Sequence, residues 1–270
     1  MKIYGLTDRG MVREVNEDSI GISCFPNGIT VAVVCDGMGG AAGGKTASYI
    51  GESVFMETVT ELLFPKRKSK EGSDAPTPLP DVKKMKKALE AGVLAANRAI
   101  FEHTLIHEEL SGMGCTLNAI IYSKEQGKLC FVNVGDSRLY TINHKEIKQL
   151  SKDHSFVQYL IDTKEITPEE AENHPNKNLI TRAVGIDMVV EPDISYIKVP
   201  SKKPTAYLLC SDGLHGALTA GEIKDIVTSQ MGVEEKVFSL IRNANDAGGL
   251  DNVSAILLQI NQNGWEAKRK

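Results

Sequence analysis

Three aspartates lie where apolar, strand-like runs of the sequence meet a turn. Asp36 follows the run VAVVC, Asp212 follows AYLLCS, and Asp251 comes just before NVSAILLQI. Folds assemble oxygen-rich pockets for hard divalent cations from carboxylates of this kind, drawn from distant parts of a chain. The three residues therefore predict a site for hard divalent cations, with each Asp at the mouth of its strand and not within it.

Glycines and acidic residues gather in eight short segments between residues 9 and 254. In chain order these segments are RGMVREVNED (9–18), CDGMGG (35–40), SGMGCT (111–116), NVGDSRLY (133–140), LSKDHS (150–155), LITRAVG (179–185), CSDGL (210–214) and GGLDNVS (248–254). A lone Asp-Gly pair is usually only a turn. The ordered set, however, resembles the type 2C metal-dependent Ser/Thr protein phosphatases (the PPM family), in particular their compact bacterial members.

The resemblance implies a role for each residue that matches a family motif. It makes Asp36 a catalytic residue that bridges two Mn²⁺ or Mg²⁺ ions, with the carbonyl of Gly37 on one of them. It places Asp212 and Asp251 on the other ion, and Glu17 near the ions, acting largely through bound water. A water or hydroxide that bridges the two ions would attack the phosphorus of phosphoserine or phosphothreonine.

Arg13 is the second catalytic residue that we expect, and it is the candidate for substrate binding. A guanidinium can donate two parallel hydrogen bonds to phosphoryl oxygens, which an ammonium cannot reproduce. The resemblance also implies a third, weaker cation site formed by Asp136 with Asp212. Its occupancy stays open, because Gly216 stands where many family members have an acid or Asn. The source of the leaving-group proton stays open too, because Met38 stands where some eukaryotic relatives have His.

Nine strand-like and six helical segments must position these side chains. The strand-like segments are rich in Val, Ile, Leu, Tyr and Phe and are bounded by Gly, Asn and Asp; they are 2–6, 19–24, 29–35, 116–122, 128–134, 138–142, 194–199, 206–211 and 253–260. The helical segments are 43–63, 81–107, 154–162, 168–173, 220–230 and 232–246. Successive strands and widely spaced helices favour an α+β fold. The resemblance implies two antiparallel β-sheets packed as a central sandwich, flanked by helices on both sides (α-β-β-α).

The resemblance implies a single phosphatase catalytic domain over 1–262, followed by a short basic tail at 263–270. Residues 65–80 are charged and then Pro-rich without periodicity, which predicts a flexible loop, with a docking role for its basic cluster as the alternative. Residues 154–178 form a polar insert that in bacterial relatives is a mobile flap beside the active site. An ordinary surface excursion is the alternative for this insert.

The composition excludes several classes of protein. The chain has 270 residues, a net charge of −4 and a pI near 5.9, so it lacks the excess of positive charge that is typical of nucleic-acid-binding proteins. It lacks a signal-peptide core and any run of about 18 apolar residues, so we expect no membrane span. Five cysteines without a CxxC motif fit a reducing cytoplasm. By resemblance we expect a monomer that acts on phosphorylated Ser/Thr proteins opposite a cognate Ser/Thr kinase.

Two alternatives to a general phosphatase stand beside this prediction. One is a catalytically inactive member of the same fold that acts as a binding scaffold. Loss of a metal-binding Asp would be its sequence signature, but Asp36, Asp212 and Asp251 are all present. The other is a phosphatase dedicated to one phosphoprotein of a sigma-factor pathway. A kinase is disfavoured, because the chain lacks a kinase Gly-rich loop, a VAIK-type Lys and an HRD motif.

Overall fold

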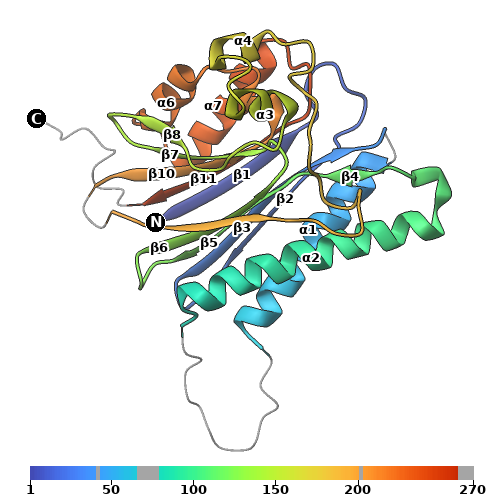
Figure 1. Cartoon of the computed structure of the whole chain (residues 1–270). Helices are drawn as coiled ribbons and strands as arrows, with labels where there is room; N and C mark the ends of the chain where they lie inside the picture. Colours follow the sequence, from blue (N-terminus) through green and yellow to red (C-terminus); the bar gives the residue numbers. More distant parts are fainter. Residues whose placement is uncertain (41–42, 66–78, 201–202, 261–270) are drawn as a thin grey trace, which may run out of the picture.

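Two antiparallel sheets form the centre of the molecule in the computed structural model, which describes residues 1–40, 43–65, 79–200 and 203–260 (Figure 1). The first sheet has the strand order β1 (Lys2–Asp8), β11 (Val253–Ile260), β10 (Thr205–Cys210), β7 (Arg138–Ile142) and β8 (Ile147–Gln149). The second has the order β2 (Asp18–Cys24), β3 (Ile29–Met38), β5 (Leu117–Ser123), β6 (Lys128–Val134) and β9 (Asp193–Lys198), with β4 (Gly114–Cys115) paired to the end of β3.

Helices cover the outer faces of both sheets (Figure 1). The second sheet is covered by α1 (Gly43–Leu63) and α2 (Val82–Ile106). The first is covered by α5 (Asp212–His215), α6 (Ala220–Thr228) and α7 (Val233–Asp246). The remaining helices are the 3₁₀ turn η1 (Glu108–Leu110), α3 (Phe156–Asp162) and α4 (Pro168–Glu172). The predicted α+β sandwich with helices on both sides is therefore confirmed.

The alternation of side chains along the central strands explains why there are four layers. In β3, Val31 and Val33 belong to the core that packs under α1 and α2, whereas Ala32 and Val34 belong to the core between the two sheets. Successive side chains of a strand point to opposite faces. Because both sets are fully buried, both faces of this strand must be covered, one by helices and the other by the second sheet.

The edges of some elements differ from the prediction. Asp36 lies inside β3, because the strand continues to Met38 by pairing with β4 (Gly37 with Cys115, Met38 with Gly114). The expectation that this Asp stands at the mouth of its strand was therefore wrong. Asp212 lies two residues after the end of β10 and begins the short helix α5, which Ser211 precedes. Elements as short as β4, β8 and α5 contain too few residues to show a hydrophobic period.

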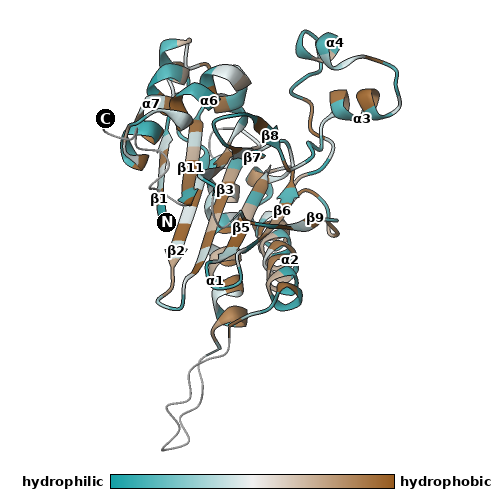
Figure 2. Ribbon diagram, turned by 90° about the vertical axis from the view of Figure 1, so that its left-hand side faces the viewer, coloured by the Kyte–Doolittle hydropathy of each residue, from teal (hydrophilic) through white to brown (hydrophobic). Residues whose placement is uncertain are grey.

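The insert at 154–178 forms α3 and α4, which stand apart from the sheets (Figure 2). Ser155 caps α3 through a hydrogen bond from the backbone N–H of Gln158 (3.2 Å), and Thr167 and Glu170 form a capping box at the start of α4. Residues 66–78 of the predicted loop at 65–80, and the whole predicted tail at 263–270, lie outside the described residues. Within the described ranges, no helix has both the length and the apolar character that crossing a membrane requires.

Candidate metal and phosphate site

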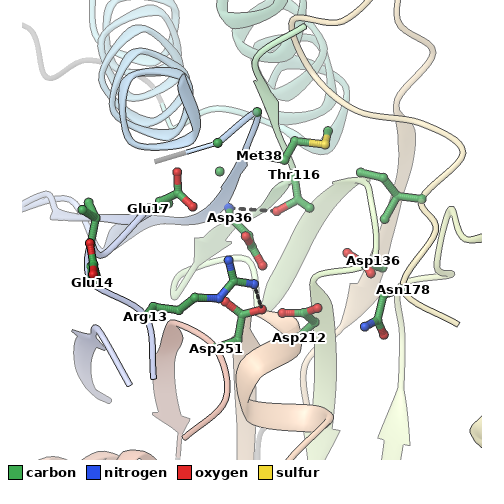
Figure 3. Close-up of a pocket in the computed structure, with 15 residues that line it drawn as sticks. Arg13, Glu14, Glu17, Asp36, Met38, Thr116, Asp136, Asn178, Asp212 and Asp251 are labelled. Carbon is green, nitrogen blue, oxygen red and sulfur yellow. Dashed lines mark hydrogen bonds and ion pairs between the residues drawn. The ribbon is translucent and has the colours of Figure 1, made fainter. Parts of the chain in front are cut away.

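One acidic pocket of about 500 Å³ lies where the two sheets meet at one end of the sandwich (Figure 3). All seven predicted site residues line it: Arg13, Glu17, Asp36, Gly37, Asp136, Asp212 and Asp251. Three of the seven come from connections that pass from one sheet to the other, whereas Asp36 and Gly37 lie inside β3, Asp212 begins α5 and Asp251 precedes β11. Arg13 and Glu17 lie between β1 and β2, and Asp136 lies between β6 and β7. The topology, and not proximity in sequence, assembles this pocket.

The backbone of Asp36 is held by two hydrogen bonds to one residue, Thr116. Its N–H donates to Thr116 Oγ1 (3.0 Å), and its carbonyl accepts from the N–H of Thr116 (2.8 Å). The Thr116 hydroxyl is in turn 2.7 Å from that of Ser137. The carboxyl group of Asp36 is therefore carried on a backbone with little freedom to move.

Gly37 is required by a close approach of two segments. Its N–H donates to the carbonyl of Glu17 (3.1 Å), and a Cβ at this position would collide with the backbone oxygens of Gly44 and Glu17. Only glycine lets the strand after Asp36 pass this close to the segment that carries Glu17. Both residues consequently face the same pocket.

Negative charge is crowded in the pocket. Burial, together with the charges of Asp18 and Asp212, holds the pKa of Asp36 well above its usual range. Burial, and then the charge of Asp212, raises the pKa of Asp136 to about 7. Burial and the charge of Asp251 raise the pKa of Asp212 as well. Carboxyl groups crowded in this way are stabilised when a proton or a cation neutralises their charge.

Glu17 and Asp18 supply a second observation that fits a cation. Within the described part of the chain, Glu17 Oε1 and Asp18 Oδ1 are buried and have no hydrogen-bond partner. Buried polar atoms without partners are costly, so these two oxygens indicate a partner that is an ion or its water. The other oxygen of Asp18, Oδ2, accepts from Ser211 Oγ (2.8 Å) and Ser254 Oγ (2.6 Å), and so supports the pocket through hydrogen bonds.

The side chains do not by themselves form a closed cage around an ion. Among the described residues, no group of three His, Cys, Asp or Glu side chains has the arrangement of a complete metal cluster. Mg²⁺ keeps several waters in protein sites and needs only one or two direct carboxylates. The chemistry of the donor set, which consists of carboxylates and a backbone carbonyl, fits such hydrated hard cations.

Arg13 lies at the mouth of the pocket. Its Nη2 donates to Asp251 Oδ2 (2.7 Å), and about half of the side chain is exposed (Figure 3). The contact joins the one cationic group of the predicted set to one of its carboxylates. Arg13 is therefore placed where an anion that enters the pocket would meet it.

Comparison with known proteins decides the family. The family model for protein phosphatase 2C matches residues 11–257. The chain belongs to the protein phosphatase 2C family. It is therefore classed with the metal-dependent protein phosphatases, as the ordered motifs predicted.

Three relatives illustrate the match of this type 2C chain. The serine/threonine phosphatase Stp of Listeria welshimeri is 36% identical over 263 residues, which cover 97% of each chain. The crystal structure of Stp1 from Staphylococcus aureus is 32% identical, with a TM-score of 0.84 and coverage of 96% of this chain and 94% of that one. A structure of the PstP catalytic domain in complex with two manganese ions is also 32% identical (TM-score 0.74, covering 96% and 98%).

Several residues of the type 2C site were missed at the sequence level. Asn178, the last residue of the insert, and Ile180, just after it, line the pocket together with Asp136. His215 lies behind Asp136, with Nε2–H donating to its carbonyl (3.1 Å); burial and the charge of Arg138 lower its pKa to about 3. Its place directly after the SDGL segment was the only signal. Thr116, the last residue of the segment SGMGCT, also lines the pocket and was not predicted as a site residue.

The two other motif arginines lie outside the pocket and make ion pairs elsewhere. Arg138 donates through Nη2 to Asp153 Oδ2 (2.7 Å), and Arg182 donates through Nη1 to Asp193 Oδ1 (3.1 Å). Neither is among the residues that line the type 2C pocket. These ion pairs favour a structural role for both arginines.

Proposed function

We propose that the chain hydrolyses phosphoserine and phosphothreonine in proteins at the acidic pocket, with Arg13 and Asp36 as catalytic residues. The observation that carries the proposal is the convergence of all seven predicted residues on one pocket. The crowding of its carboxyl groups supports it, because such crowding is costly unless cations are bound. Its relatives in Listeria welshimeri and Staphylococcus aureus are named serine/threonine phosphatases, which supports the substrate class.

Two Mn²⁺ or Mg²⁺ ions are the cofactors in this proposal. Asp36 and the carbonyl of Gly37 would hold one side of the pair, Asp212 and Asp251 would hold the other, and Glu17 would hold bound water. When bound, the ions supply an activated water and neutralise charge on the phosphoryl oxygens. The manganese-bound relative supports the choice of metal.

Asp136 lies across the pocket as the candidate for a third, weaker site with Asp212. Gly216 brings no side-chain ligand to it; its N–H donates instead to the carbonyl of Asp212 (2.7 Å). A cation at this site would therefore depend on water for the rest of its ligands.

Arg13 binds and orients the phosphoryl group in this proposal. The guanidinium presents several N–H groups, of which one on Nη2 is used by Asp251. The others are available for two phosphoryl oxygens. Because Asp251 holds the guanidinium, the group that binds phosphate and the carboxylate that binds the cation keep a fixed distance and orientation. Such positioning of groups around the reacting atoms lowers the activation barrier.

The remaining assignments complete the proposal. The chain from 1 to 262 is one catalytic domain, and the insert at 154–178 is a mobile flap beside the pocket. We propose that the enzyme acts as a cytoplasmic monomer on phosphorylated Ser/Thr proteins, opposite a Ser/Thr kinase. The lack of a basic character in the composition supports protein over nucleic-acid partners. Hydrogen exchange tests the flap, since protection at the level of the core across 160–175 would contradict its mobility.

The decisive experiment is hydrolysis of p-nitrophenyl phosphate and of a phosphothreonine peptide, with and without Mn²⁺. We expect turnover of both substrates with Mn²⁺ and its loss when EDTA is added. A phosphotyrosine peptide of the same sequence is the control for substrate class. Activity that EDTA leaves undiminished would defeat the two-metal assignment.

A further inference from the structure

Two loops beside Arg13 carry large apolar side chains that face solvent. Met11, Val12 and Leu250 are 67%, 61% and 75% exposed. A single exposed apolar side chain is ordinary in a soluble protein. Three of them on two adjoining loops form a patch, and such patches at the edge of a site mark places where a partner binds. We refer to Met11, Val12 and Leu250 as the apolar rim.

The two loops of the apolar rim are fixed against each other. The backbone N–H groups of Met11 and Val12 both donate to the carbonyl of Gly249, at 2.8 and 3.2 Å. Gly249 has a φ of +53°, and a Cβ there would meet the Met11 side chain at 2.7 Å. The close contact between the loops therefore requires glycine, and it holds residues 11–12 next to residue 250.

The apolar rim directly adjoins the proposed phosphate site. Val12 precedes Arg13, Leu250 precedes Asp251, and the side chains of Arg13 and Asp251 are hydrogen-bonded at 2.7 Å. Consecutive Cα atoms are about 3.8 Å apart, so every rim Cα lies within about 8 Å of the Cα of Arg13 or Asp251. The rim residues themselves do not line the pocket. They therefore lie on the exposed surface just outside the pocket.

We propose that the apolar rim binds apolar side chains within about three residues of the phosphorylated Ser or Thr of the substrate. The inference rests on the proposed function, which places the phosphoryl group at Arg13. An extended chain advances about 3.3–3.6 Å per residue, so three residues reach about 10 Å from the phosphorylated position. Met11 suits such a surface, because its flexible side chain adapts to differently shaped partners.

The test uses two phosphothreonine peptides that differ only in the residues flanking the phosphothreonine. One carries Leu at the two positions on each side, and the other carries Ser. With Mn²⁺ present, we expect the wild-type chain to favour the Leu peptide by about tenfold in kcat/KM, the size of effect that burial of an aliphatic side chain produces. In a Met11→Ser/Leu250→Ser double variant the preference should fall below about twofold.

A matched control separates the rim from surface hydrophobicity in general. Ile106 and Met188 are 77% and 76% exposed and do not line the pocket. An Ile106→Ser/Met188→Ser double variant removes one methionine and one branched aliphatic side chain elsewhere, as the rim variant does at the rim, and should keep the tenfold preference. A loss of preference in this control would overturn the proposal.

The outcomes distinguish failure of the rim from failure of the proposed function. If the wild-type chain hydrolyses both peptides equally well, the rim proposal is overturned and the phosphatase assignment stands. If it hydrolyses neither peptide nor p-nitrophenyl phosphate with Mn²⁺, the phosphatase assignment fails and the rim proposal fails with it. If the rim variant loses hydrolysis of p-nitrophenyl phosphate as well, the effect comes from damage to the pocket, and the rim proposal is overturned.

Discussion

Asn252 Oδ1 accepts a hydrogen bond from the backbone N–H of Glu17 at 2.7 Å, across a sequence separation of 235 residues. Its Nδ2 donates to the carbonyls of Arg9 and Val15, at 2.8 and 3.0 Å. One buried side chain therefore fixes the backbone on both sides of Arg13. Since Glu17 and Arg13 are both in the proposed site, Asn252 acts as a positioning residue for it.

Replacing Asn252 by Ala should weaken catalysis through Arg13 and Glu17. Loss of the three hydrogen bonds frees the segment, and small displacements of positioned groups cost large factors in rate. We expect kcat/KM for a phosphothreonine peptide to fall by about 10- to 100-fold, with a rise in KM. Unfolding in urea should show a loss of about 2–3 kcal/mol, because buried backbone groups lose their partners.

Asn97 provides the matched control for Asn252. It is also buried, its Oδ1 accepts from the N–H of Gly185 (2.7 Å), and its Nδ2 donates to the carbonyls of Asp187 (2.9 Å) and Met188 (3.3 Å). Asn97→Ala thus removes three hydrogen bonds of the same kind from a segment without a proposed catalytic residue. The variant should lose about as much stability as Asn252→Ala, whereas its kcat/KM should stay close to that of the wild type. Equal kinetic losses in the two variants would contradict the positioning role of Asn252.

Asp212→Asn should separate activity from stability. With Mn²⁺ we expect kcat/KM to fall by at least about 100-fold, because a cation ligand is removed. Without metal the variant should be no less stable than the wild type, since burial and the charge of Asp251 raise the pKa of Asp212 and make its charged form unfavourable. Thermal unfolding of the variant and the wild type in EDTA compares their stabilities without metal. Turnover near that of the wild type would show that the ligand assignment is wrong.

The acidic part of the site could be predicted from sequence because residue type and position were sufficient. Asp36, Asp212 and Asp251 each adjoin a strongly apolar run, and such runs become buried strands whose ends meet at one edge. The two packed sheets were expected from the resemblance of the ordered motifs to the type 2C phosphatases, and the structure buries every residue of 31–35 between them and the helices. The exact end of β3 could not be predicted, because it depends on pairing with the two-residue strand β4.

The supporting part of the site could not be predicted in the same way. Asn252 and His215 act through contacts with residues that are far away in sequence: 235 residues for Asn252 with Glu17, and 79 for His215 with Asp136. No local pattern distinguishes such a polar residue from one that merely faces solvent. Their roles follow only from the tertiary structure.

Arg13→Lys should show whether the fork geometry of the guanidinium is needed. Lysine keeps the positive charge but cannot donate to Asp251 and to two phosphoryl oxygens in one plane. We expect kcat/KM for p-nitrophenyl phosphate to fall by about 10- to 100-fold and inhibition by inorganic phosphate to weaken. Arg13→Ala should have a lower kcat/KM than Arg13→Lys and should be inhibited still more weakly by inorganic phosphate. A lysine variant with wild-type kinetics would refute bidentate binding by Arg13.

His154 should make stability depend on pH. Its Nδ1 accepts from the N–H of Gly135 (3.1 Å), and its Nε2 lies 3.2 Å from both Asp193 Oδ2 and Arg182 Nη1. Burial, opposed by Asp193 and reinforced by Arg182, lowers the pKa of this imidazole below its usual value of 6.5. At pH values between the lowered pKa and 6.5, His154 binds a proton in the unfolded chain but not in the folded chain. The contribution of His154 to the free energy of unfolding is therefore complete above pH 6.5 and is lost as the pH falls from 6.5 through the lowered pKa.

The variant His154→Asn removes this titration and isolates it from that of the acidic pocket. We expect the wild type to be more stable than the variant at pH 7.5 and the difference to narrow as the pH falls to 5. The carboxyl groups with raised pKa values are common to both proteins, so their pH dependence cancels in the difference. Thermal unfolding of both proteins in EDTA at half-unit steps of pH measures it. A difference that stays constant from pH 7.5 to 5 would show that His154 does not couple folding to protonation.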